Sequence, residues 1–193
     1  MLFRSLRRAA GRFLEDRAGL ESIHDRAAAA RTIVFTGMGS SYDACYPAVN
    51  DLAGRGVPAL LVDSAELLHF RRAILGPDTL LVIVSQSGES AEIVKLAKEI
   101  ERQKRRPFLV SVTNGTQNDL ARAADVRLDT AAGPESGPST VTFSAAMATL
   151  SGLARLLAGD GVATAVDRTR TAVEGTALAQ ERLLDDPEAS AER

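Results

Sequence analysis

Residues 80–90 read Leu80-Leu81-Val82-Ile83-Val84-Ser85-Gln86-Ser87-Gly88-Glu89-Ser90, and they carry the strongest strand signal of the chain. Its first five residues are all apolar and end in three β-branched side chains, a pattern that predicts a strand buried on both faces. Gly88 and the hydroxyl residues that follow the strand predict a turn. Residues 89–105 then repeat apolar side chains at helical spacing, so this stretch predicts a strand–loop–helix unit.

The same strand–loop–helix unit recurs on both sides of this stretch. Short apolar runs predict further strands at residues 32–36, 59–63, 108–112 and 125–128. Further helices are predicted at 42–53, 64–71, 119–124 and 140–157, the second of them with Ser64 as its N-cap. Strands that alternate with helices and stay apolar throughout are typical of a parallel sheet covered on both faces. We therefore expect an α/β fold, doubly wound, with five parallel strands in a flavodoxin-like order.

Helical patterns also flank this unit. Residues 6–15 and 20–30 precede the first strand, and residues 162–184 follow the last predicted helix of the sheet region. We expect three parts: N-terminal helices over residues 1–31, a ligand-binding domain over 32–158, and a C-terminal helix or connector over 159–193.

Composition narrows the function classes. The 193 residues carry 23 Lys and Arg against 25 Asp and Glu, a net charge of −2 that argues against nucleic acid or an anionic membrane as a partner. Cys45 is the single cysteine, so an internal disulfide is impossible and a reducing cytoplasm fits. Because no apolar run is long enough to span a bilayer, we expect a cytoplasmic protein without a membrane partner.

Two loops stand out chemically, and both follow strands that we expect to be neighbours. After the first strand, Gly37 and Gly39 allow a sharp turn, and Ser40 and Ser41 open the next helix. In a doubly wound sheet the ligand binds where the winding reverses, beyond the carboxyl ends of the first and third strands. The loop after the third strand supplies an amide and three hydroxyls, from Gln86, Ser85, Ser87 and Ser90.

Such a set of donors at a helix N-terminus suits a phosphate ester, because free backbone N–H groups and the helix dipole both favour an anion. Neither loop contains Lys or Arg, so neutral donors would hold the phosphate. One hydroxyl is enough to cap a helix, and six polar side chains over two loops exceed that need. The sequence therefore predicts a cleft for a small phosphate ester, with no metal and no cofactor.

These segments resemble the SIS (sugar isomerase) domain family over about residues 32–157, and within it the first lobe of the isomerase region of glucosamine-6-phosphate synthase and related deglycases and amino-sugar isomerase/deaminases. The resemblance is carried by Gly39-Ser40-Ser41-Tyr42, Ser64-Ala65-Glu66, Ser85-Gln86-Ser87-Gly88-Glu89-Ser90, Val112-Thr113-Asn114 with Leu120 and Ala124-Asp125, and Gly133-Pro134-Glu135-Ser136-Gly137 with Ser139-Thr140.

The resemblance implies a role for each of these loops. Phosphate binding is implied for Ser85, Gln86, Ser87 and Ser90, with Ser40 and Ser41 on the other side of the ligand. The loop containing Glu135, Ser139 and Thr140 would close over the sugar. Family members often carry a lysine directly after the Ser-Thr pair, and this chain has Val141 there.

A catalytic group is harder to find, because an isomerase needs a base next to the carbonyl. Glu66 and Glu135 are weak candidates, and we expect His24 and His69 to be inert. In the synthase-like relatives the principal catalytic residues belong to a second lobe, and residues 183–188 resemble the connector into it. We therefore expect a lobe that binds a hexose or aminohexose 6-phosphate, with a homodimer or a second lobe as partner, and leave open whether the chain itself is an enzyme.

Three other functions compete with this interpretation. Gly37, Gly39 and Asp63 fit part of an NAD(P)-binding Rossmann pattern, although Tyr42 replaces its third glycine. A single-lobe phosphoheptose isomerase has similar length, but this chain has no histidine after His69. A sugar-sensing transcription regulator would need a DNA-binding domain before residue 32, and too few residues precede that position.

Overall fold

The structure, a computed structural model, describes residues 2–135 and 139–185. Five parallel strands form one sheet in the order β2-β1-β3-β4-β5. Their bounds are Thr32–Gly37 (β1), Ala59–Asp63 (β2), Thr79–Val84 (β3), Phe108–Thr113 (β4) and Val126–Asp129 (β5). The flavodoxin-like order expected from the sequence is confirmed.

Within these described residues, helices alternate with the strands and extend the chain at both ends. They are α1 (Leu2–Glu15), α2 (Arg17–Ala29), α3 (Ser40–Gly54), α4 (Ser64–Phe70), α5 (Ala91–Glu101), α6 (Asp119–Ala123), α7 (Val141–Leu157) and α8 (Val162–Asp185), with a short 3-10 turn at Arg72–Ile74. None of these described helices combines the length and hydrophobicity needed to cross a bilayer.

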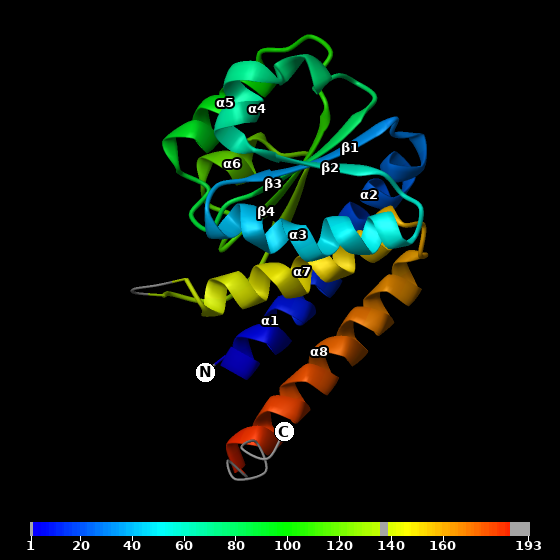
Figure 1. Ribbon diagram of the computed structural model, residues 1–193, viewed down its shortest axis with the longest axis vertical. Coiled ribbons are helices and arrows are strands. Elements are labelled where there is room, and N and C mark those ends of the chain that lie inside the picture. Colours follow the sequence, from blue (N-terminus) through cyan, green and yellow to red (C-terminus); the bar gives the residue numbers. More distant parts are fainter. Residues whose placement is uncertain (1, 136–138, 186–193) are drawn as a thin grey trace.

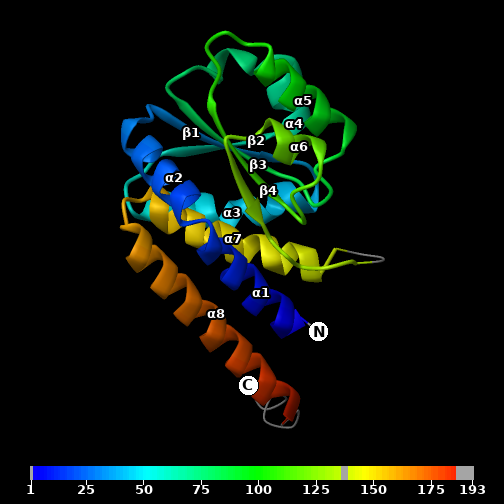
Figure 2. The same ribbon diagram turned by 180° about the vertical axis from the view of Figure 1, so that it is seen from behind.

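The helices form two layers around the sheet. Helices α4, α5 and α6 cover one face, while α3 and α7 cover the other (Figure 1 and Figure 2). On that second face α1 and α2 pack beside α7 and contact the edge strand β5, and α8 packs on the outside of α1 and α7. Strand β3 lies at the centre of the sheet and contributes side chains to the hydrophobic cores on both faces, because successive side chains of a strand point to opposite faces. Leu80, Val82 and Val84 join the α3–α7 core, and Leu81 and Ile83 join the α4–α6 core.

The N-terminal helices share the core of the α3–α7 face. Phe13 of α1 and Leu20 and Ile23 of α2 are buried with residues of the sheet and α7. Gly152 permits the close approach of α1 to α7, since a Cβ atom there would lie 2.6 Å from Cε1 of Phe13. The division into residues 1–31, 32–158 and 159–193 stays a prediction.

Two local expectations are corrected by the structure. Helix α5 begins at Ala91 and ends at Glu101, not over 89–105, because Gly88 has a φ of 67° and residues 85–90 turn before the helix starts. The N-cap of α4 is Asp63, one residue before Ser64. The Asp63 carboxylate accepts from the backbone N–H of Ala65 at 2.8 Å, whereas the Ser64 hydroxyl is buried 2.9 Å from that of Thr36.

Candidate functional site

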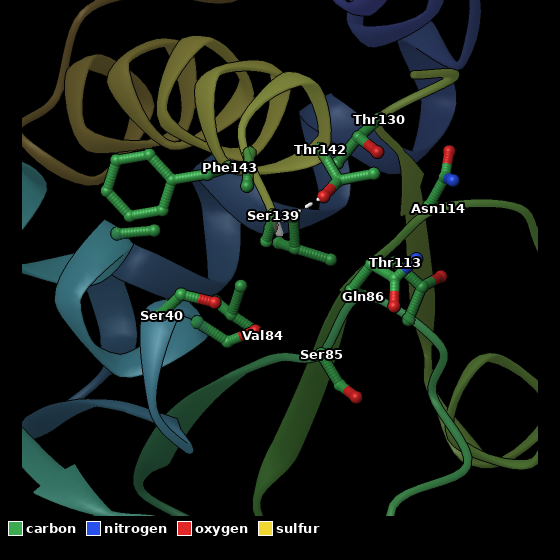
Figure 3. A pocket seen from close by; sticks show the side chains of 14 residues that line it. Ser40, Val84, Ser85, Gln86, Thr113, Asn114, Thr130, Ser139, Thr142 and Phe143 are labelled. Carbon is green, nitrogen blue, oxygen red and sulfur yellow. Dashed lines mark hydrogen bonds between the residues drawn. The ribbon is translucent and has the colours of Figure 1, made fainter. Parts of the chain in front are cut away.

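The two hydroxyl-rich loops meet at the carboxyl ends of β1 and β3, the switch point of the sheet order. A cleft opens there between the first turn of α3, the first turn of α7 and the ends of β3 and β4 (Figure 3). Five residues predicted from the sequence line it: Ser40, Ser41, Ser85, Gln86 and Ser139. Loops that lie more than forty residues apart in the chain are thus brought to one cleft.

A second hollow adjoins the first, because both are lined by Ser41, Val84, Ser85 and Gln86. It extends toward α5 and is lined in addition by Ser87 and Ser90. Because the family resemblance implies phosphate binding by the serines next to α5, we call this part the phosphate side of the cleft, and the part between α3 and α7 the sugar side. Every serine predicted in the two loops therefore faces one of the two sides.

Three predicted residues, Glu66, Glu135 and Thr140, do not line the cleft. Glu66 is exposed on the first turn of α4, where its carboxylate lies 3.3 Å from the guanidinium of Arg71. Thr140 is exposed and serves as the N-cap residue of α7, donating its hydroxyl to Glu135 at 3.0 Å. Of the loop expected to close over the ligand, Ser136, Gly137 and Pro138 lie outside the described residues.

The β3–α5 loop (residues 85–90) is held by its own serines. The Ser85 hydroxyl accepts from the backbone N–H of Gly88 at 3.1 Å, and the Ser87 hydroxyl accepts from that of Glu89 at 3.2 Å. Each hydroxyl that accepts in this way keeps its own hydrogen free to donate. These side chains therefore shape the loop and still offer O–H donors to a ligand.

Two asparagines, Asn114 and Asn118, also hold the β3–α5 loop in place. The backbone N–H of Asn114 donates to the carbonyl of Gln86 at 3.0 Å, which ties the end of β4 to the loop. The side chain of Asn118 caps α6 by accepting from Ala121, and it packs directly beneath Gly88. A donor array fixed before the ligand arrives loses less conformational freedom on binding.

Glu135 has a structural task at the start of α7. Its carboxylate accepts hydrogen bonds from the hydroxyls of Thr140 and Thr142 and from the backbone N–H groups of Thr140, Val141 and Thr142. The Thr142 hydroxyl, followed by these backbone donors, lowers the pKa of Glu135 from 4.5 to about 2. A carboxylate held so firmly in its ionised form is a poor proton acceptor near neutral pH.

The helix N-termini at the cleft differ in their caps. Helices α3 and α5 begin after Gly39 and Ser90, and within the described residues neither has a side-chain cap hydrogen bond. Helix α7 is capped by Glu135 instead. The free N–H groups and positive dipole ends of α3 and α5 are therefore available to an anion, whereas those of α7 are satisfied internally.

Sequence reasoning missed several residues on the sugar side. Thr113, Asn114, Thr130, Thr142 and Phe143 all line it. Thr113 is the last residue of β4, Asn114 follows it, and Thr130 follows β5, so the rule that ligands bind at the carboxyl ends of strands could have found these three. Thr142 and Phe143 lie on the first turn of α7, and only the tertiary packing turns that helix toward the cleft (Figure 3).

Ionisable side chains are absent from the cleft lining among the residues the structure describes. His24 pairs with Asp25 on α2, and His69 is exposed beside Phe70, so neither histidine reaches the site. Cys45 is buried one turn after Ser41, where burial raises the pKa of its thiol to about 12. Val141, at the position of the family lysine, packs against the α1–α7–α8 cluster.

An open parallel sheet with hydroxyl-rich loops and two uncapped helix ends at its switch point places this chain among the doubly wound α/β domains, with donors that suit an anion. The family model for the SIS domain matches residues 28–156, and the chain belongs to that family. This assignment favours the phosphosugar interpretation over a dinucleotide-binding one. The carboxylate of Asp63, expected on a ribose in the dinucleotide interpretation, caps α4.

Two kinds of curated relative match the chain. Arabinose 5-phosphate isomerase KdsD of Pseudomonas aeruginosa is 33% identical over 138 residues, which are 72% of this chain and 40% of the relative. Glutamine–fructose-6-phosphate aminotransferase of Pyrobaculum aerophilum is 33% identical over 134 residues, 69% of this chain and 22% of the relative. The chain thus spans less than half the length of either relative.

Solved structures share the fold at low identity. The C-terminal domain of glucosamine-fructose-6-phosphate aminotransferase from Francisella tularensis superposes with a TM-score of 0.72 at 20% identity, covering 92% of this chain and 52% of that one. The NanR protein of Vibrio vulnificus, complexed with ManNAc-6P, has a TM-score of 0.67 at 22% identity and covers 92% of this chain and 66% of its own.

Proposed function

We propose that this chain binds a sugar phosphate of the hexose or aminohexose 6-phosphate class, as one lobe of a cytoplasmic isomerase, aminotransferase or deglycase of amino-sugar metabolism. One observation carries the proposal: two uncapped helix N-termini and the hydroxyls of two separate loops converge on one cleft at the switch point of the sheet. Serines that only stabilise their own loops need not meet at one cleft, whereas binding an oxyanion requires several donors at the same place.

The phosphate fits the side of the cleft next to α5. Ser87, Ser90 and Gln86 present polar side chains there, and the dipole of an eleven-residue helix points its positive end at the same place. The N-terminus of α7 is a poorer position for the phosphate, because the Glu135 carboxylate already occupies it and would repel a second anion.

The sugar then extends between α3 and α7. Ser40 and Ser139 offer hydroxyls at the rim, and the Ser139 hydroxyl lies 2.7 Å from that of Thr142 (Figure 3). Phe143 and Ala146 supply an apolar wall. A mixed wall of hydroxyls and carbon suits a sugar, whose faces are apolar and whose edges are polar.

Proton transfer requires a further group. No Asp, Glu, His, Lys or Arg lines the cleft in the described part of the chain, and both weak candidates have other partners: Glu66 pairs with Arg71 and Glu135 caps α7. In this proposal the chain binds the sugar phosphate, and a second lobe or a second copy of the chain supplies the base.

A pentose 5-phosphate is the second candidate ligand. The identity of 33% to an arabinose 5-phosphate isomerase extends over 72% of this chain, slightly more than the share matched by the aminotransferase. The phosphate side of the cleft would be used in the same way, and only the length of the sugar would change.

Isothermal titration calorimetry tests the proposal. The panel is fructose 6-phosphate, glucosamine 6-phosphate, arabinose 5-phosphate, sedoheptulose 7-phosphate, the free sugars and NADH. We expect saturable binding of at least one sugar phosphate, at least tenfold weaker binding of its free sugar, and loss of binding in Ser85→Ala/Ser87→Ala. Ser151→Ala, an exposed serine of α7 outside this cleft, is the control and should bind like the wild type.

The same panel contains the outcomes that contradict the proposal. Saturable NADH binding with no response to any sugar phosphate would support the dinucleotide-binding interpretation instead. Turnover of the heptose phosphate by the isolated chain would favour a single-lobe isomerase. A thermal shift supports the calorimetry, because a ligand at a hundred times its dissociation constant adds about 2.7 kcal/mol to the free energy of unfolding.

A further inference from the structure

The connection between β5 and α7, of which residues 130–135, 139 and 140 are described, borders the sugar side of the cleft. Its first residue, Thr130, lines the cleft, and Glu135 caps α7, which carries Thr142 and Phe143. Its path is unusual, because Ala131 has a φ of 46° and Gly133 a φ of 84°. A left-handed alanine costs about 1–2 kcal/mol, so other contacts must hold this conformation.

Helix α1 supplies such contacts from one side. The Ser5 hydroxyl donates to the carbonyl of Ala132 at 3.2 Å, and Nη2 of Arg8 donates to the same carbonyl at 3.0 Å. Nη2 of Arg8 also lies 3.1 Å from the Ser5 hydroxyl. The arginine covers Gly133 so closely that a Cβ atom there would lie 3.3 Å from its Nη2.

Asn114 holds the same two residues from the other side. Its side-chain oxygen accepts from the N–H of Ala132 at 3.0 Å, and its side-chain nitrogen donates to the carbonyl of Gly133 at 2.8 Å. Asn114 meets the β5–α7 connection through its side chain, whereas its bond to the carbonyl of Gln86 in the β3–α5 loop is made separately by its main-chain N–H. Ala132 is clamped between α1 and a residue that lines the site.

We infer that Arg8 and Ser5 of α1 are positioning residues for the sugar side of this cleft, although they precede the family match at residues 28–156. The inference rests on the proposed function. Arg8 acts through the carbonyl of Ala132. It fixes the β5–α7 connection, which in turn sets Thr130, Asn114 and the first turn of α7 around the sugar. The β3–α5 loop has its own serine and asparagine anchors and stays in place without α1.

Arg7 provides a matched control on the same helix. It is the neighbouring residue, carries the same charge, and makes ion pairs at 3.0 Å with Glu174 and Glu181 of α8, away from the cleft. Replacing Arg7 tests the loss of an arginine from α1, and replacing Arg8 tests the contact with the β5–α7 connection.

The test measures the affinities of Arg8→Ala, Ser5→Ala and Arg7→Ala for two probes: the tightest sugar phosphate of the panel, and inorganic phosphate, followed by ³¹P NMR. We expect Arg8→Ala to weaken the sugar phosphate about tenfold and Ser5→Ala about threefold, with phosphate affinity unchanged in both. Arg8→Lys should recover part of the loss, since an ammonium group can donate to the same carbonyl. Arg7→Ala should bind both probes like the wild type.

Hydrogen exchange adds a readout that a general loss of stability would not produce. The N–H of Ala132 bonds Asn114, and its exchange should accelerate in Arg8→Ala but not in Arg7→Ala. The inference is overturned if Arg8→Ala and Arg7→Ala bind alike, or if Arg8→Ala weakens both probes equally. If Arg8→Ala does not fold, Ser5→Ala is compared with Arg7→Ala for the same two probes, and that comparison tests the inference. If the wild type binds no sugar phosphate, the proposed function itself has failed.

Discussion

The side-chain oxygen of Asn118 lies 2.1 Å from the place where a Cβ atom on Gly88 would stand. The asparagine caps α6 and bonds the carbonyl of Gly115 at 2.9 Å, so it cannot move aside without losing both contacts. This contact lets the β3–α5 loop lie directly on the cap of the next helix, and it requires glycine at residue 88 for space as well as for its φ of 67°.

Gly88→Ala should therefore lower the free energy of unfolding by about 2 kcal/mol, from the left-handed backbone and the displaced cap together. It should also weaken phosphate binding, because the loop shifts. Gly56→Ala is the control: its φ is 76° but open space surrounds it, so about 1 kcal/mol is expected. Guanidinium denaturation measures both. Equal losses would mean that the contact with Asn118 does not matter.

Glu135 should make stability depend on pH in the acid range. Its pKa falls from 4.5 to about 2 on folding, so its contribution is complete above the unfolded value and is lost as the pH falls from about 5 toward 2. Glu135→Gln should remove this contribution and flatten the stability curve over that window. Urea denaturation at pH 7, 4 and 3 compares the two proteins.

Glu66→Gln serves as the control for that experiment, because Glu66 is exposed and has only a surface ion pair with Arg71. It should keep the acid sensitivity of the wild type. A Glu135→Gln protein with the same acid profile as the wild type would show that the α7 cap contributes nothing in solution.

Replacing a buried hydroxyl that has no hydrogen-bond partner should raise the free energy of unfolding. Within the described residues, Oγ1 of Thr130 and Oγ of Ser111 are buried and make no hydrogen bond. An unsatisfied buried polar group costs about 1–3 kcal/mol, so Thr130→Val and Ser111→Ala should each raise the free energy of unfolding by about 1 kcal/mol.

Thr149→Val is the matched comparison, because the Thr149 hydroxyl is equally buried but donates to the carbonyl of Ala145 at 3.1 Å. This variant should not be stabilised. Chemical denaturation of the three variants decides the point, and destabilisation of all three by the same amount would refute it.

Cys45 should be inert in the folded protein. Its thiol is buried, its pKa is raised to about 12, and it lies 3.3 Å from the carbonyl of Ser41. Only the thiolate reacts with disulfide reagents, so labelling at pH 8 should be slow for the native chain and complete in 6 M guanidinium at about one thiol per chain. Fast native labelling would show that the first turn of α3 opens.

Sequence reasoning was most successful where local pattern and burial coincide. The run Leu80–Val84 has no polar residue to place on a surface, so it could only be a strand covered on both faces. It failed where two neighbouring residues could both take the same structural role. Asp63 and Ser64 can both cap a helix, and the choice of Asp63 depends on Thr36 being in place to pair with Ser64.

The strands, helices and serine-rich loops of the sheet follow from the sequence, because apolar runs, glycine turns and helix starts are properties of short segments. The rule of right-handed crossovers narrowed the strand order to a few doubly wound possibilities. The other groups that meet these loops follow from tertiary packing, which brought Thr113 and Thr130 to the cleft and set Arg8 of α1 against Ala132, 124 positions away. Such contacts depend on how the layers pack, and no local pattern records that packing.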